Sequence, residues 1–285
     1  MRHVGTGGEG DGGRPGGAEH VRTHPFSFAR SPFAREGRGM DREGPPGLLA
    51  AVYEGDADAV VRLLRDGADP EAADEDGQTA LYVAAVGDEP GIVRLLLAAG
   101  ADPDRLSGGT DAPLCGAACG GHEQVVRALL AAGATVDLEE EYGFRSLTWA
   151  VRLGHAGVVA ALLAAGADPD RPGPGGEPPL VAAARRGSPG CVRALLAAGA
   201  GARAEALAEA RRWAAADVAA ELRAGLEAAY GPGPGYRVRR FVAEKGAPTV
   251  EVTLVRDGRV VAGDDRQLGH AAIVTELLGR AGRGV

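Results

Sequence analysis

The stretch Gly67-Ala68-Asp69-Pro70 decides the fold, because it returns at a fixed interval along the chain. It recurs as Gly100-Ala101-Asp102-Pro103 and Gly166-Ala167-Asp168-Pro169, and weaker copies begin at Gly133 and Gly199. The five glycines are separated by four consecutive intervals of 33 residues. Self-similarity at a constant period of this length indicates a repeat architecture, in which each unit stacks on its neighbours.

Each of these glycines follows an apolar pattern typical of a short helix. Two leucines precede the glycine, and branched or small apolar residues lie four positions earlier, as Ile92-Val93 lie before Leu96-Leu97. This spacing places both pairs on one helix face, and the glycine supplies the positive φ that ends the helix. Upstream, residues 79–85 predict another short helix, and a turn such as Gly154-His155 joins the two. Each unit is therefore predicted to be a helix, a turn, a second helix and a polar loop.

These features together resemble ankyrin repeats of a bacterial type, with five units within residues 40–202. The resemblance implies an all-α solenoid of helix-turn-helix repeats; another array of helix pairs is the alternative fold. The family's Thr-Pro-Leu-His opening is never complete, since only residues 112–115 and 178–181 keep its Pro-Leu pair. In the family the missing histidine ties adjacent repeats together, so we expect looser interfaces here.

The repeat pattern stops after Gly199. Residues 203–230 predict two charged helices that cap the array, because a repeat array needs an atypical last unit to close its core. The Gly-Pro run at 231–235 is predicted to be a linker, since neither a helix nor a central strand crosses such a sequence. Residues 236–285 predict a small appendage made of a β-hairpin, with a turn at Asp257-Gly258, and a helix that resembles the second half of a repeat.

Residues 1–39 differ from the rest because they contain ten glycines and neither leucine nor isoleucine. Such a composition buries too little apolar surface to offset the entropy of ordering, so we expect a disordered tail. Met40 is the alternative start of the protein, because residues 40–43 lead directly into the first unit.

The composition narrows the classes of function. A net charge of −8 argues against whole-surface binding to nucleic acid or to an anionic membrane. No secretory signal is visible at the first residues, and three cysteines do not make a disulfide framework. We therefore expect a cytoplasmic protein, monomeric alone, without contacts to nucleic acid or membrane. The single lysine among 31 basic residues suggests a GC-rich, bacterial genome.

Few residues suggest chemistry. Cys115 and Cys119 are four positions apart, with His122 nearby, but a closed zinc site needs further ligands and a nucleophile needs an orienting group. We interpret these residues as structural. The acidic run at 139–141 is interpreted as solvated charge or an acidic docking surface. We therefore predict no catalytic residue, no metal and no cofactor, and we do not expect an enzyme.

We predict a non-catalytic scaffold for protein–protein interaction; the alternative is a regulatory or inhibitory subunit of a single enzyme or toxin. In ankyrin-like proteins the partner side comprises loop tips and exposed first-helix positions. Transferred by phase, the predicted partner-binding residues are Tyr53, Glu54, Glu75, Asp76, Gln78, Leu106, Asp111, Glu141, Tyr142, Phe144, Arg152, Leu153, Glu177, Arg185 and Arg186.

Trp149 is assigned to structure instead. By phase it takes the first-helix position that Gly116 and Ala182 hold in the adjacent units, and this position faces the core in ankyrin-like repeats. A large indole between two small residues would keep the layers densely packed. We therefore expect Trp149 to be buried between units, and a larger side chain at Gly116 to overpack the same space.

Overall fold

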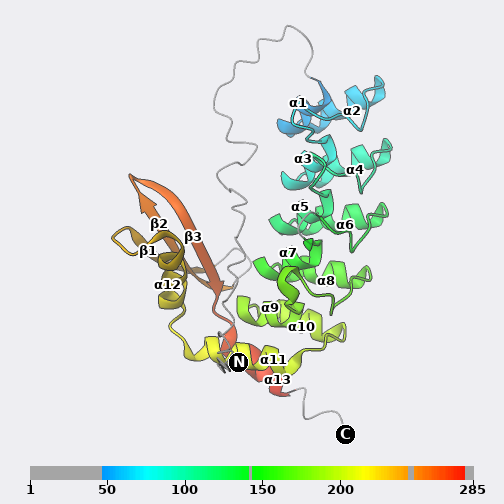
Figure 1. Ribbon diagram of the computed structural model, residues 1–285. Helices are drawn as coiled ribbons and strands as arrows, with labels where there is room; N and C mark the ends of the chain where they lie inside the picture. The colour runs from blue at the N-terminus through cyan, green and yellow to red at the C-terminus, as the bar shows by residue number, and fades with distance from the viewer. Residues whose placement is uncertain (1–46, 141–142, 243–246, 280–285) are drawn as a thin grey trace, which may run out of the picture. The chain divides into compact units, whose positions relative to one another are not determined.

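A computed structural model describes residues 47–140, 143–242 and 247–279, and all of these belong to one compact unit, residues 40–285. The predicted tail at 1–39 and the start at Met40 lie outside the described residues. Figure 1 shows helices stacked in pairs, followed by a small sheet with one helix beside it. The structure therefore combines a helical solenoid with a C-terminal antiparallel sheet, as the sequence predicts.

Five helix pairs form the array (Figure 1). Each first helix packs on the next first helix, and each second helix packs on the next second helix. The first helices are α1 (Leu48–Tyr53), α3 (Ala80–Val86), α5 (Pro113–Gly120), α7 (Ser146–Leu153) and α9 (Pro179–Arg186). The second helices are α2 (Ala57–Arg65), α4 (Pro90–Ala98), α6 (Glu123–Ala131), α8 (Ala156–Ala164) and α10 (Pro189–Ala197).

The repeated glycines end the second helices as predicted. Gly67 and Gly199 have φ angles of +90° and +91°, in the left-handed region where a side chain would be strained. Before the glycines, residues such as Ile92 and Leu96 are fully buried between helices. Alanines in the first helices, such as Ala117, are also fully buried, which lets neighbouring helices approach closely.

A ladder of carboxylates joins successive loops of the array. Each carboxylate lies four residues after a repeated glycine and accepts a hydrogen bond from a backbone N–H of the next loop, 31 residues on, at 2.5–3.3 Å. The bond repeats between successive units and joins their loops in addition to the helix packing, while the expectation of looser interfaces stays a prediction. The pairs are Glu71 with Asp102, Asp104 with Thr135, Asp137 with Asp168 and Asp170 with Gly201.

The C-terminal sheet has three strands, where the sequence predicted a two-stranded hairpin. β2 (Pro248–Arg256) and β3 (Arg259–Gln267) form the expected hairpin, and β1 (Tyr236–Val242) pairs antiparallel with the other side of β2. A two-stranded hairpin is marginal in water, and the extra strand supplies a second row of ladder bonds. Helix α12 (Val218–Tyr230) packs on β2 and β3 and encloses a separate small core.

A sixth helix pair closes the array, and its two helices come from separate parts of the chain. Helix α11 (Arg203–Ala215) packs on α9, and α13 (His270–Gly279) packs on α10 and α11, as second helices do elsewhere (Figure 1). Ile273 and Leu277 of α13 lie in the core of the array. Because α12 packs on the sheet, our assignment of both helices in 203–230 to the cap was wrong for α12.

Two equivalent histidines identify this sixth pair. Nε2 of His155 lies 3.0 Å from the carbonyl oxygen of Cys119, and Nε2 of His270 lies 3.2 Å from that of Arg185. Cys119 and Arg185 are two repeat periods apart, so His270 stands to the fifth pair as His155 stands to the third. Residues 216–269, which contain α12 and the sheet, are thus an insertion between the two helices of one repeat-like pair.

Candidate partner-binding face

The predicted partner-binding residues differ in how far they reach solvent. Glu54, Glu75 and Asp76 are exposed, whereas Arg186 is only 8% exposed. Glu141 and Tyr142 lie outside the described residues. The half-buried members are Tyr53, Gln78, Leu106, Asp111, Phe144, Arg152, Leu153, Glu177 and Arg185.

An aromatic cluster lies at the fourth helix pair. The rings of Phe144 and Trp149 stack with their centroids 4.4 Å apart, and the guanidinium of Arg152 lies 5.4 Å from the Phe144 centroid. The loop before α7 supplies Phe144, while α7 itself supplies the other two. Stacked aromatics next to arginine are the residue types that contribute most at protein interfaces.

Trp149 is half-buried, where the sequence predicts a buried position between units. Ala150 and Leu147 fill the core at this level, and the indole turns toward Phe144 and donates a hydrogen bond from Nε1 to Glu140 at 3.0 Å. An indole N–H needs an acceptor, which the core lacks and the Glu140 carboxylate supplies. At Gly116, a Cβ would lie 2.8 Å from Val86 Cγ1, which agrees with the expected overpacking.

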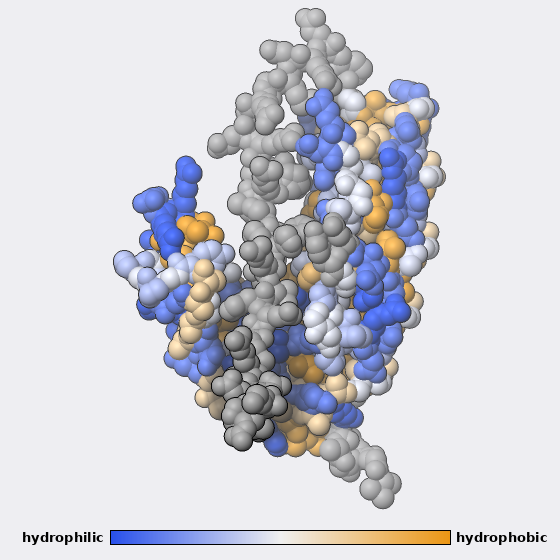
Figure 2. All heavy atoms as spheres, viewed as in Figure 1, coloured by the Kyte–Doolittle hydropathy of each residue, from blue (hydrophilic) through white to orange (hydrophobic). Residues whose placement is uncertain are grey.

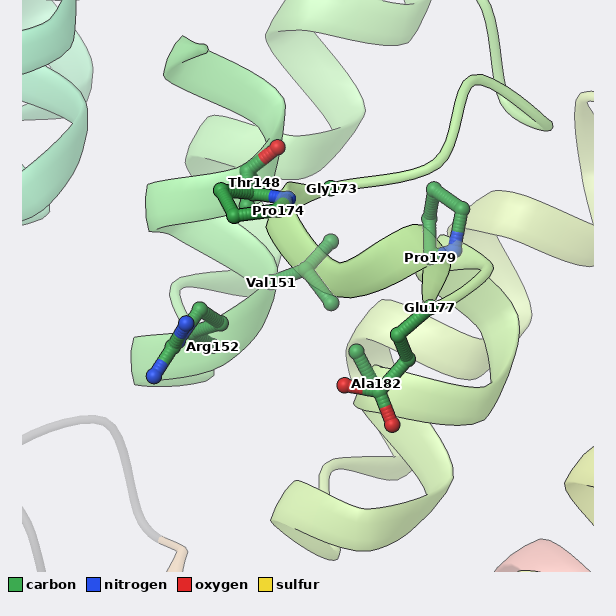
Figure 3. A pocket seen from close by; sticks show the side chains of 8 residues that line it. All are labelled: Thr148, Val151, Arg152, Gly173, Pro174, Glu177, Pro179 and Ala182. Carbon is green, nitrogen blue, oxygen red and sulfur yellow. The ribbon is translucent and has the colours of Figure 1, made fainter. Parts of the chain in front are cut away.

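A shallow pocket adjoins this cluster between α7 and α9 (Figure 3). Thr148 and Arg152 are one helical turn apart on α7, and Figure 3 shows their side chains along one side of the pocket, with Glu177 on the other. Sequence reasoning missed Thr148 and the short 3₁₀ turn η4 (Pro174–Gly176), although the four-residue spacing of Thr148 and Arg152 was a readable signal. The lining residues are Thr148, Val151, Arg152, Gly173, Pro174, Glu177, Pro179 and Ala182.

The later end of the face is occupied by the chain itself. Arg186 is buried and donates hydrogen bonds to both the carboxylate and the carbonyl oxygen of Asp265 on β3, each at 2.7 Å. Arg185 pairs with Glu177 and Glu209, both at 2.8 Å. Our placement of Arg186 on the partner surface is corrected by these contacts, because its guanidinium fastens the inserted sheet to the array.

The model of the ankyrin-repeat family (three copies) matches residues 33–107 and 91–172. The chain is an ankyrin-repeat protein. Ankyrin repeats generally mediate protein–protein interaction, and they are typically non-catalytic modules. Comparison with curated proteins gave no match. Within the described ranges, every helix is too short or too polar to cross a membrane.

Glu140 of the ankyrin-repeat protein has a structural task that the acidic run did not reveal. Its carboxylate accepts hydrogen bonds from the backbone N–H of Ala112 at 2.9 Å and from Trp149. Burial raises the pKa of Glu140, while these two hydrogen bonds oppose the rise. Glu139 pairs with Arg145. The interpretation of this run as solvated charge is therefore wrong for Glu140, whose half-buried carboxylate joins the third and fourth ankyrin units.

The cysteines and histidines of the ankyrin array make local contacts. Cys115 is buried, and its Sγ lies 3.3 Å from Ser146 Oγ. Burial raises the pKa of the Cys119 thiol to about 11, which opposes formation of a nucleophilic thiolate. His122 Nδ1 lies 3.5 Å from a carboxylate oxygen of Asp88. Across the part of the chain that the structure describes, no three His, Cys, Asp or Glu side chains gather as a metal site would require.

Proposed function

We propose that this protein is a non-catalytic scaffold that binds a partner protein along the loop tips and first-helix face of its ankyrin array. A helical array offers a continuous face of variable side chains on a rigid frame, which suits protein partners. The stacked Phe144–Trp149 pair is the observation that carries the proposal. Two large aromatic side chains remain partly exposed there, in a chain with an aromatic content of only 4%.

Quantitative affinity purification from the native host tests this function. The full-length protein is the bait, and Phe144→Ala is the matched variant, because Phe144 lies in a loop and its removal leaves the helices intact. Truncation of an interface aromatic costs about 2 kcal/mol or more, so recovery of a direct partner should fall by about tenfold or more. The exposed Arg193→Gln on α10, away from this face, serves as the control.

The outcome also separates the two function classes. Several partners that depend on Phe144 would support a scaffold, whereas one dominant partner in stoichiometric amount would favour a regulatory or inhibitory subunit. Partners that bind equally to the wild-type and Phe144→Ala proteins would contradict binding at this face. Far-UV circular dichroism of both variants verifies that the helices are retained.

A further inference from the structure

Arg152 differs from the other arginines around it. Each neighbouring guanidinium has a carboxylate partner within the chain, whereas Arg152 has neither an ion pair nor a hydrogen bond within the described residues. Its guanidinium lies over the face of the Phe144 ring. The neighbouring pairs are Arg145 with Glu139, Arg185 with Glu177 and Glu209, Arg186 with Asp265, and Arg266 with Asp264.

The surroundings of Arg152 disfavour its positive charge. Burial lowers the pKa of its guanidinium; Glu177 and Asp264 oppose the shift, and Arg266 and Arg185 add to it. A guanidinium nevertheless stays charged in proteins. Glu177, which lines the same pocket, is already paired with Arg185. Among the residues that the structure describes, Arg152 is therefore a half-buried cation without a carboxylate paired to it.

The position of Arg152 indicates which chemical group could bind its guanidinium. Its guanidinium lies at the rim of the pocket between α7 and α9, one turn from the hydroxyl of Thr148 (Figure 3). A planar guanidinium binds a carboxylate through two parallel hydrogen bonds, which also fixes the direction of the bound group. Phe144, with Trp149 stacked on it, gives an apolar surface on which a neighbouring side chain can pack.

Resting on the proposed function, we infer that Arg152 binds an Asp or Glu side chain of the partner protein, in a segment that also places an apolar side chain on Phe144. Charge complementarity at Arg152 supports this occupant, while the acidic remainder of the array restricts where an acidic side chain can dock. Residues 46–202 carry 22 acidic and 11 basic residues, so most of the array repels an acidic segment. At the fourth helix pair, the Arg152 guanidinium, which has no ion pair within the described part of the chain, offers such a segment a contact of opposite charge.

A displayed peptide library provides a defined probe. Random twelve-residue peptides with their C-termini fused to the display protein, and therefore without a free terminal carboxylate, are selected on the full-length protein. An enriched peptide and its Glu→Gln or Asp→Asn form are then synthesised with amidated C-termini. Fluorescence anisotropy measures their binding to the wild-type protein and to Arg152→Gln, Arg152→Lys, Phe144→Ala and, as the matched control, Arg193→Gln.

We expect enriched peptides to share an acidic residue near an apolar one. The wild-type protein should bind the acidic peptide about tenfold to a hundredfold more tightly than its amide form, as suits a charge-assisted pair. In Arg152→Gln this ratio should fall to about one. Arg152→Lys should restore part of it, and Arg193→Gln should keep the wild-type ratio.

The outcomes separate the two proposals. Peptides that require Phe144 but bind equally well as acid and amide would overturn the role of Arg152 and leave the binding face supported. A preference for the acid that persists in Arg152→Gln would likewise overturn it. Peptides unaffected by both Phe144→Ala and Arg152→Gln would contradict the proposed function itself, and so would a library without enrichment.

Discussion

The ankyrin array and the inserted sheet are stabilised by different kinds of contacts. In the array, contacts recur every 33 residues, from the buried alanines and leucines to the carboxylate ladder between loops. In the insertion, α12 and the sheet enclose their own small core around Val250 and Val252. The array is therefore stabilised by the same contacts repeated from unit to unit, whereas the insertion is stabilised by contacts that occur only once.

The two regions also differ in charge and surface. Residues 46–202 have twice as many acidic as basic residues, while residues 236–267 contain seven basic and five acidic ones. Figure 2 shows apolar side chains among strongly hydrophilic ones over the sheet, where Val238, Val242, Val260 and Val261 are exposed. The inserted region lies between α11 and α13 in the sequence. The second helix of the last pair, α13, therefore follows the strands of the sheet along the chain.

The largest expected effect separates these two cores. Ile273 of α13 is fully buried in the core of the array, whereas Leu222 of α12 is buried against the sheet. Ile273→Ala and Leu222→Ala should each cost about 2–5 kcal/mol locally, because both leave a cavity. Only Ile273→Ala should lower the unfolding midpoint reported by the tryptophans, because Trp149 and Trp213 both lie in the helical array and α13 packs on α11, which carries Trp213.

Urea titrations followed by tryptophan fluorescence and by hydrogen exchange measure this difference. Leu222→Ala is the matched variant, and it should increase exchange mainly in α12 and β2 while the fluorescence transition stays near its wild-type midpoint. Equal shifts of that midpoint in the two variants would show that the insertion and the array unfold as one cooperative unit, and the division into two cores would be wrong.

The array could be predicted from the sequence because its information is local and repeated. The glycines, leucine pairs and Gly-His turns recur at one period, so each unit supports the assignment of the others. The sixth pair could not be assembled in this way. Residues 268–278 resemble half of a repeat, but the other half, α11, is separated from α13 by the 54 residues 216–269 and lacks the loop pattern.

The position of each candidate residue within its repeat could be predicted from the sequence, but the contacts of its side chain could not. The phase placed Phe144 at a loop tip and Arg152 at an exposed first-helix position, yet it placed Trp149 in the core. The phase cannot show that Glu140 accepts the indole hydrogen bond. Arg186 failed for a similar reason. Its partner, Asp265, lies 79 residues away in a region without repetition, and such a pair leaves no periodic signal.

The contact between the two regions should have an intermediate effect. Asp265→Asn removes the negative charge opposite the buried Arg186 but keeps the bond to the backbone carbonyl of residue 265. A hydrogen bond to a charged group contributes about 1.5–3 kcal/mol. We expect the lower end of that range, because the Asp265 side chain is 37% exposed. Urea unfolding at low and high salt measures the loss.

Glu251→Gln is the control within the sheet. Glu251 pairs with Arg239 at 2.9 Å, but the arginine side chain is 67% exposed, and such surface pairs contribute about 0–1 kcal/mol. If Asp265→Asn destabilised the protein no more than Glu251→Gln, the Arg186 contact would not be what fastens the insertion to the array.

The smallest expected effect is a dependence on pH at the sixth helix pair. His270 is 3% exposed, its ring stacks on Trp213 with centroids 5.9 Å apart, and its Nε2 meets the carbonyl oxygen of Arg185. Burial lowers the pKa of His270; the bond to Arg185 and nearby Glu209 oppose the shift, while Arg266 adds to it. The folded protein therefore holds His270 neutral at a pH where the unfolded chain already binds a proton.

The lower pKa of His270 in the folded state decides whether stability rises or falls with pH. Where the unfolded state binds more protons, stability rises with pH. The contribution of His270 is thus present above the ordinary histidine pKa of about 6.5 and is lost as the pH falls through the lowered folded value. Urea titrations between about pH 8 and pH 5, followed through tryptophan fluorescence, should show a midpoint that falls with acid in the wild type and falls less in His270→Gln. Identical slopes in the two proteins would mean that other groups cause the acid sensitivity. A weaker dependence of the urea midpoint on pH in His270→Gln would show that acid destabilises the array at the sixth helix pair, α11 with α13.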